Sequence, residues 1–305
     1  MKAENKSVVF IGQDVYGGMC LGRLLENHVP VSAVITRQDY PEERGNMVKD
    51  LVENRRLPLC QPEDIKGAEV IRFVKSLNPF ALFVASYGQK LPPEILGCPV
   101  WFPVNFHPSL LPKYRGATPI NWAIINGEVE TGVTAHFITE GFDNGRTISQ
   151  EKVEIRDDDT AQSLNERLAD IAAIMAVHTY GGLLAGNVSS YPQDETKASW
   201  FPKRTEKHAV VDWRKPAKDI HNLIRGMCPY PLARSYHDGR IVRFSSSEII
   251  DADAKGFYPG YIVCALTKNH LMVATGDKNK ILGVNVHDED ERVFDASKAF
   301  VNILD

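Results

Sequence analysis

Short apolar runs that alternate with helical stretches constrain the fold more than any other feature of this sequence. Three such runs have the length of buried strands: Val8–Ile11, Val31–Ile35 and Ala81–Val84. The stretches with helical patterning cover residues 19–25, 47–53 and 70–77. Strands that alternate with helices predict a mainly parallel sheet with helices on its faces.

The turn after the first run is rich in glycine. Its sequence from Gly12 to Gly18 does not match the G-x-G-x-x-G fingerprint of dinucleotide sites. We therefore interpret it as a tight turn between a strand and a helix. Turns in this position line the ligand crevice of open parallel sheets, so Gly12 is a candidate for contact with a substrate.

The pattern of apolar residues changes after a polar stretch that contains Pro192 and Pro202. A short helix is expected over residues 216–227, and alternating runs predict strands over 240–244, 261–265, 270–275 and 281–286. Asp238-Gly239 is a strong hairpin signal. We expect a catalytic domain over residues 1–190, a linker over 191–204 and a β-rich, barrel-like domain over 205–305.

Charge and cysteine usage narrow the class of protein. The net charge is -4 and the pI about 6.2, whereas dedicated nucleic-acid binders carry a basic excess or face. The five cysteines include no C-x-x-C pair, so neither a zinc site nor a disulfide framework is indicated. With no apolar leader or membrane span visible, the sequence favours a cytoplasmic protein that acts on a small molecule.

The segment from Val104 to Gly116 holds the densest chemistry. Asn105 and His107 stand two residues apart at the end of an apolar run, so both side chains are expected on one face of a sheet. Pro108 ends the strand because proline cannot donate to a ladder. The pair therefore lies where a strand leaves the sheet, the usual place for a site in this fold class.

These two side chains complement one another chemically. An asparagine amide can donate to a developing oxyanion, and a neutral histidine can take a proton from an attacking amine. Taken alone, Asn105 could equally cap a turn and His107 could be a core histidine. Asp143, in the run Glu140–Gly145, has the same two readings: a turn residue, or a carboxylate that orients His107 or receives the proton.

Together these segments carry a resemblance to a known family. The pattern N-x-H-P-S-L-L-P-x-Y-R-G, followed by T-G-V-T and G-F-D-N-G, is similar to the folate-dependent formyltransferases. Asp212-Trp213, Ile220–Gly226 and Pro259-Gly260 extend the resemblance over nearly the whole chain. It implies a Rossmann-like N-terminal domain and a C-terminal barrel related to OB folds.

The resemblance also implies the chemistry. The family's catalytic triad corresponds to Asn105, His107 and Asp143 without departure, and either His107 or Asp143 can be the principal base. The formyl donor implied is 10-formyltetrahydrofolate, and no metal is needed. Its pterin end is expected against two loops, with the candidate contacts Tyr87, Gly88, Gln89, Leu91, Phe137, Ile138 and Gly141.

The acceptor is a separate question. The sequence favours the primary amine of a small molecule, because residues 36–50 hold three basic and four acidic side chains, a net of -1, where a tRNA-binding member would need basic ones. We expect the acceptor near Gly12, Arg115 and Trp122, with Arg115 either pairing with an anionic group on it or forming a structural ion pair. Initiator tRNA, water (a hydrolase) and a catalytically silent folate-binding regulatory module are the alternatives. The sequence predicts no oligomeric state.

Overall fold

The computed structural model describes residues 6–39, 46–267, 269–287 and 300. The elements of the first part of the chain are β1 (Val8–Gly12), α1 (Asp14–Glu26), β2 (Val31–Ile35), α2 (Met47–Arg55), β3 (Leu59–Cys60), α3 (Ala68–Leu77), β4 (Ala81–Ala85), α4 (Pro93–Leu96), β5 (Val104–His107), β6 (Arg115–Gly116), α5 (Pro119–Ile125), β7 (Glu130–Phe137), β8 (Thr147–Glu154) and α6 (Ala161–Ala185). The remainder comprises η1 (Glu195–Lys197), β9 (Trp200–Phe201), η2 (Glu206–Ala209), α7 (Ala217–Met227), β10 (Ala233–His237), β11 (Arg240–Asp251), β12 (Ile262–Thr267), β13 (His270–Ala274) and β14 (Lys280–His287).

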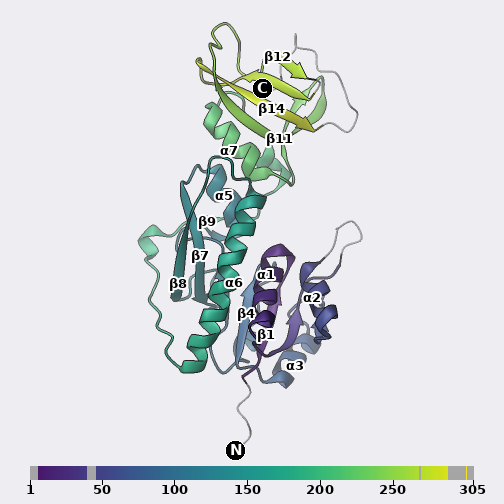
Figure 1. Ribbon diagram of the computed structural model, residues 1–305, viewed down its shortest axis with the longest axis vertical. Helices are drawn as coiled ribbons and strands as arrows, with labels where there is room; N and C mark the ends of the chain where they lie inside the picture. The colour runs from purple at the N-terminus through teal and green to yellow at the C-terminus, as the bar shows by residue number, and fades with distance from the viewer. Residues whose placement is uncertain (1–5, 40–45, 268, 288–299, 301–305) are drawn as a thin grey trace, which may run out of the picture. The chain divides into compact units, whose positions relative to one another are not determined.

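A seven-stranded sheet organises the first part of the chain (Figure 1). Its order is β3-β2-β1-β4-β5-β7-β8; the strands from β3 to β5 run parallel, and β7 and β8 are antiparallel to their neighbours. The chain moves outward from β1 to β3 and then returns to add β4 on the other side. The predicted Rossmann-like, mainly parallel sheet is confirmed.

The apolar runs became strands because both of their faces are covered. Every residue of β1 and β4 is buried, as expected for parallel strands that lie between layers of helices. Val9 and Ile11 pack in one cluster with Val70 and Val74 of α3, while α1 packs against β1 and β4. Gly12 is a requirement of this packing, because a Cβ atom there would lie 2.7 Å from the carbonyl oxygen of Ala85.

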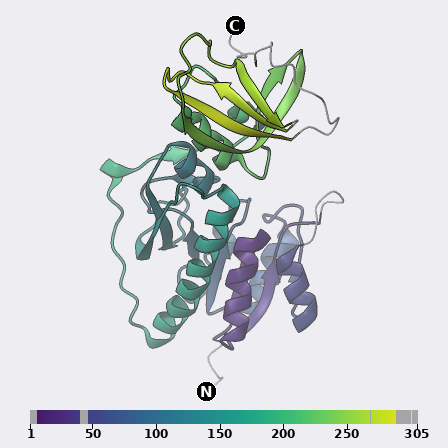
Figure 2. The same ribbon diagram turned by 45° about the horizontal axis from the view of Figure 1, so that its top comes forward.

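A five-stranded antiparallel sheet forms the C-terminal part, in the order β10-β11-β14-β13-β12 (Figure 2). Asp238 and Gly239 join β10 to β11 with φ angles of 50° and 72°, the geometry that the hairpin signal predicts. The predicted C-terminal β domain is confirmed, although β11 runs on to Asp251, well beyond the expected strand over 240–244. Residues 288–299 and 301–305 of the predicted C-terminal domain lie outside the part of the chain that the structure describes.

The chain divides into two compact units that are not continuous in sequence. The first unit contains Met1–Gly116, Glu130–Glu154 and Asn165–Trp200, and the second contains Ala117–Val129, Ile155–Leu164 and Phe201–Asp305. The second unit thus includes two segments from within the expected catalytic domain. The domain limits 1–190, 191–204 and 205–305 stay a prediction.

Helix α6 is long and apolar. By length and composition it could cross a membrane, but half of its most apolar 18-residue window is buried inside the protein, as in a core helix. Leu164, Leu168 and Ala172 form its buried stripe at helical spacing.

Candidate active site

Strand β5 places Asn105 and His107 on the same face of the large sheet. Asn105 is level with Val84 of the parallel neighbour β4, and His107 extends past the end of that pairing. His107 is buried, with 5% of its surface exposed, and Asn105 is half-buried. Both side chains therefore lie at the carboxyl ends of the parallel strands β4 and β5, as the sequence predicts.

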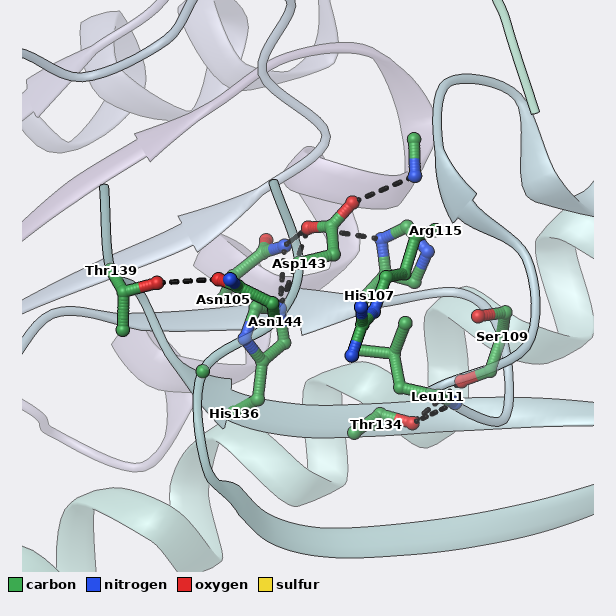
Figure 3. Close-up of polar contacts among 12 residues, drawn as sticks. Asn105, His107, Ser109, Leu111, Arg115, Thr134, His136, Thr139, Asp143 and Asn144 are labelled. Atoms are coloured by element: carbon green, nitrogen blue, oxygen red, sulfur yellow. Dashed lines mark hydrogen bonds and ion pairs between the residues drawn. The ribbon is translucent and has the colours of Figure 1, made fainter. Parts of the chain in front are cut away.

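Strand β7 adds two more polar side chains to this face. In its antiparallel pairing with β5, His136 stands directly opposite Asn105, and Thr134 stands opposite His107. Opposite residues of an antiparallel pair project to the same side of a sheet. Figure 3 shows Asn105, His107 and His136 around Asp143, whereas Thr134 bonds Ser109 and Leu111 of the loop after β5.

The loop after β7 returns to the sheet and brings Asp143 to this group. Asp143 has a φ of 51°, and Gly145 lies so close to the carbonyl oxygen of Phe137 that a Cβ atom would lie 1.7 Å from it. Gln193 also fixes the loop, because its Nε2 donates at 2.7 Å to the carbonyl oxygens of both Asp143 and Gly145. Glycine at position 145 is thus required by the tightness of this loop.

The two oxygens of the Asp143 carboxylate have different surroundings. Oδ2 accepts a hydrogen bond from the backbone N–H of Gly116 at 2.9 Å. Oδ1 accepts a longer one from Asn105 Nδ2 at 3.4 Å and lies 3.7 Å from His107 Nδ1 and 3.6 Å from His136 Nε2 (Figure 3). One oxygen is anchored by the backbone, and the other faces three side-chain nitrogens.

His107 is held by the loop that follows β5. Its Nε2 donates to the carbonyl oxygen of Tyr114 at 2.9 Å. The Ser109 hydroxyl donates to the Lys113 carbonyl oxygen at 2.8 Å, and Thr134 Oγ1 donates to the Ser109 carbonyl oxygen at 2.6 Å. The S-L-L-P-K-Y stretch is therefore folded into a closed loop that sets the orientation of the imidazole.

Burial and charge set the protonation states. Burial lowers the pKa of His107, and the neighbouring Asp143 carboxylate opposes that shift only in part. Burial alone would raise the pKa of Asp143, but the contacts with His107, His136 and the Gly116 N–H outweigh it and leave the pKa of Asp143 well below its ordinary value. At neutral pH the site holds a carboxylate next to a neutral imidazole.

The residues expected to contact the donor are only partly brought together. Tyr87, Leu91 and Ile138 pack in one apolar cluster of the first unit. The Tyr87 hydroxyl is buried without a hydrogen-bond partner in the described part of the chain, and burial raises its pKa to about 12. Gln89 is engaged elsewhere, since its side chain bonds the N–H of Ile65 and the carbonyl oxygen of Glu63.

The other three expected donor contacts lie at the surface or beside it. Gly88 and Gly141 are exposed, and a Cβ atom on Gly88 would meet no atom within 4 Å. Phe137 is half-buried, with its ring centroid 5.7 Å from that of Phe102. These positions leave room for a ligand without identifying one.

The three candidate acceptor contacts have structural partners of their own. Gly12 is buried in β1. Arg115, 9% exposed, forms an ion pair within the protein: its guanidinium donates to Glu195 at 2.7 and 2.9 Å and to Gln193 at 2.7 and 3.1 Å. Trp122 belongs to the second unit, where its Nε1 donates to the Pro202 carbonyl oxygen at 2.8 Å.

Sequence reasoning missed His136. It is 1% exposed and contacts both Asn105 and Asp143. The signal was present, because residues 132–137 read as a strand in which His136 alternates with Thr134 and must share its face. Within the described ranges, no group of three or more His, Cys, Asp or Glu side chains is arranged to hold a metal ion.

Comparison with known proteins agrees with this arrangement. The sequence pattern of the formyl transferase family matches residues 5–179, and that of the formyl transferase C-terminal domain matches residues 203–302. A methionyl-tRNA formyltransferase of Pelotomaculum thermopropionicum is 38% identical over 274 residues, which cover 88% of this chain and 87% of the relative. Its counterpart in Caldanaerobacter subterraneus is 37% identical over 276 residues, 88% of each protein.

Solved structures share the fold. A sugar 3N-formyl transferase crystallised with dTDP and 5-N-formyl-THF has a TM-score of 0.70 and 18% identity, and the match covers 93% of this chain and 98% of that one. An N-formyltransferase from Helicobacter canadensis has a TM-score of 0.68 and 20% identity, and covers 92% and 99%. The two family matches together span most of the sequence, and the chain belongs to the formyl transferase family.

Proposed function

We propose that this formyltransferase moves the formyl group of 10-formyltetrahydrofolate to a primary amine, with Asn105, His107 and Asp143 as its catalytic residues. The observation that carries the assignment is the group of side chains around Asp143 Oδ1. The carboxylate of Asp143 lies 3.7 Å from a buried neutral imidazole and 3.4 Å from a side-chain amide, where β4 and β5 end. Acyl transfer needs a proton acceptor and an oxyanion donor in one place.

The tautomer of His107 assigns its role. A carbonyl oxygen only accepts, so the contact with Tyr114 puts the proton of the neutral ring on Nε2 and the lone pair on Nδ1. Nδ1 faces Asp143 Oδ1 at 3.7 Å. A proton taken from the attacking amine would rest on Nδ1, where the carboxylate stabilises the imidazolium. We therefore assign His107 as the base and Asp143 as its electrostatic partner.

The Asn105 amide is the oxyanion donor in this mechanism. When the amine attacks the formyl carbon, negative charge develops on the formyl oxygen, and an N–H of the Asn105 amide stabilises that charge. Collapse of the tetrahedral species breaks the bond to N10 of the donor, which takes the proton held by His107 and leaves as tetrahydrofolate. No member of the triad changes its net charge over the complete cycle.

The donor assignment has support from the first unit. Solved relatives of the same fold were crystallised with 5-N-formyl-THF or folinic acid. The cluster of Tyr87, Leu91 and Ile138 offers an apolar wall, and the unpartnered Tyr87 hydroxyl offers a polar group. An apolar wall with a few polar groups is what a flat heteroaromatic ring requires.

We propose methionyl-tRNA as the acceptor. The support is the identity of 32–38% to methionyl-tRNA formyltransferases over most of their length. Charge is compatible with a polyanion locally, because residues 203–225 carry seven basic and three acidic side chains, a net of +4. Lys203, Lys207 and Lys215 among them are exposed. Clustered positive charge is the basis of phosphate-backbone contact.

A small amine is the second candidate, favoured by a different observation. Residues 36–50 carry a net charge of -1, and in the described part of that stretch Arg37 and Lys49 are bonded to Asp14 and Asp39. This segment offers a polyanion little free positive charge. An amino-sugar nucleotide or an amino-acid-like amine would not need it.

One experiment separates these acceptors. With one enzyme preparation and 10-formyltetrahydrofolate as donor, kcat/KM is measured on charged initiator methionyl-tRNA, on amino-sugar nucleotides, on amino-acid amines and with no acceptor. We expect methionyl-tRNA to give the highest value. A higher value on a small amine replaces the proposed acceptor, and donor breakdown that no acceptor accelerates makes the protein a hydrolase. Donor binding with no turnover under any condition makes it a regulatory module.

A further inference from the structure

His136 is a buried titratable group that the mechanism above does not use. It lies on β7 directly opposite Asn105 on β5, so its side chain projects beside the Asn105 amide on the same face of the sheet (Figure 3). Its ring stands edge-on to His107, with centroids 6.3 Å apart. His136 is 1% exposed and contacts two members of the triad, so a change in its ring would act directly on the catalytic group.

The tautomer of His136 follows from its partners. Nδ1 lies 2.9 Å from the backbone carbonyl oxygen of Phe137, which only accepts, so Nδ1 carries a proton. In the neutral ring the lone pair is then on Nε2. Nε2 lies 3.2 Å from Asn105 Nδ2, which only donates, and this contact is a hydrogen bond when Nε2 has no proton. Neutral His136 thus accepts from Asn105.

This bond fixes the orientation of the Asn105 amide. One hydrogen of Nδ2 points to His136 Nε2 at 3.2 Å and the other to Asp143 Oδ1 at 3.4 Å. With its NH₂ group between these two acceptors, the amide cannot present its carbonyl oxygen on that side. In the resting site both amide hydrogens are in use, so one bond must be released before Asn105 donates to an oxyanion.

The bond to Asp143 is the one that the reaction releases. His107 Nδ1 faces the same Oδ1 atom, and a protonated His107 is a stronger donor to a carboxylate than a neutral amide is. When His107 takes the proton, Oδ1 turns to it and the second Asn105 N–H becomes free. The bond to His136 persists and keeps the amide in place during this exchange.

We propose that His136 is a positioning residue, which in its neutral form holds the Asn105 amide so that one N–H is delivered to the reacting group when His107 is protonated. The inference rests on the proposed function. The charged and titratable groups that face His136 are His107 from β5 and Asp143 from the loop after β7. On β8, the residue paired with His136 is Thr147, which is uncharged.

Kinetics of four variants test the proposal, with the acceptor that gives the highest wild-type kcat/KM. His136→Phe keeps a ring but removes the acceptor atom, and we expect kcat to fall roughly tenfold, the size of one hydrogen bond, with the KM for donor within about twofold of wild type. His136→Gln restores a hydrogen-bond acceptor beside Asn105, and kcat should recover to within about threefold of wild type. His178→Gln, an exposed histidine of α6, is the matched control and should match wild type.

The double variant Asn105→Ala/His136→Phe shows whether His136 acts through Asn105. If it does, adding His136→Phe to Asn105→Ala costs less than about twofold. A full tenfold loss in that background overturns the proposal, as does a loss of less than about twofold in His136→Phe alone. Near-normal turnover in Asn105→Ala would instead overturn the catalytic assignment on which the proposal rests.

A measurement without turnover completes the test and applies even where a variant fails to fold. Two-bond ¹H–¹⁵N correlation spectra of the wild-type protein distinguish the tautomers of histidine rings. From the contacts of the ring we expect His136 to carry a proton on Nδ1 and none on Nε2. A ring protonated on Nε2, or on both nitrogens, contradicts the proposal and leaves the roles of His107 and Asp143 untouched.

Discussion

Each compact unit contains a buried cluster with polar atoms, and the two clusters differ in how completely those atoms are bonded. In the second unit, the Trp213 indole is fully buried against Phe244 and Phe300, and its one polar atom donates to Ser235 Oγ at 3.0 Å. In the first unit, Asp143 Oδ1 faces three nitrogens at 3.4–3.7 Å. Short bonds stabilise a core, whereas longer, shared contacts leave room for exchange during a reaction.

The comparison predicts its largest effect at Trp213. Replacing Trp213 by Ala removes a fully buried ring that packs against two aromatic side chains, and we expect the free energy of unfolding to fall by about 3–5 kcal/mol. Chemical denaturation followed by far-ultraviolet circular dichroism measures it. The control is Trp200→Ala, whose side chain is 58% exposed and which should change stability by about 0.5 kcal/mol at most. Equal losses in the two variants would mean that the C-terminal cluster does not stabilise the protein.

The active-site cluster should show the opposite behaviour. Substituting Ala for His107 or Asp143 should lower kcat by about a hundredfold or more, the usual contribution of a positioned proton acceptor. The thermal midpoint should fall by less than that of Trp213→Ala, because each side chain has one short bond, to Gly116 or Tyr114, and Oδ1 of Asp143 makes only long contacts. Turnover by each purified variant and its unfolding curve are the two measurements. A folded variant with near-normal turnover would remove that residue from the mechanism.

The sequence showed which strands carry the active-site side chains, but not which atoms those side chains contact. Period two placed Asn105 and His107 on one face, and the apolar runs gave β1, β2 and β4 to within a residue. The partners of these side chains were not visible, since they depend on register: His136 meets Asn105 because β7 pairs with β5 at that step. Strand β8 was missed because its T-I-S-Q-E-K-V-E sequence is largely polar, as an edge strand with one solvated side allows.

Long-range pairing also limits what the sequence says about Arg115. Its partner Glu195 is 80 residues away, and nothing in the local pattern around Lys113–Gly116 separates an ion pair within the protein from a ligand anchor. The sequence also does not show that residues 117–129 and 155–164 belong to the second compact unit, because the composition does not change at these segments.

The free energy of unfolding should fall at acid pH because the buried His107 ring is neutral in the folded protein. Burial lowers its pKa in the folded protein, so below the ordinary value of about 6.5 the unfolded chain binds a proton that the folded protein does not. Stability therefore falls as the pH drops from about 6.5 toward the lowered value, by at most about 1.4 kcal/mol per pH unit. His107→Asn lacks this contribution, so denaturation of both proteins between pH 7.5 and 5 measures it. Parallel pH dependence in the two proteins would contradict a neutral buried imidazole.

The smallest effect is expected at the ion pair behind the Asp143 loop. Glu195 is two-thirds exposed, and such pairs add little to stability, so Glu195→Gln should move the thermal midpoint by less than about 2 °C. The same variant releases part of the Arg115 guanidinium. If Arg115 is structural, the KM for every acceptor stays within about twofold of wild type. If it anchors an anionic acceptor, the freed guanidinium lowers the KM for phosphate-bearing acceptors and leaves the KM for uncharged amines unaffected.

Gln193→Ala is the companion variant. Gln193 bonds Arg115 and the carbonyl oxygens of Asp143 and Gly145, so the loss of its side chain should lower kcat rather than alter KM.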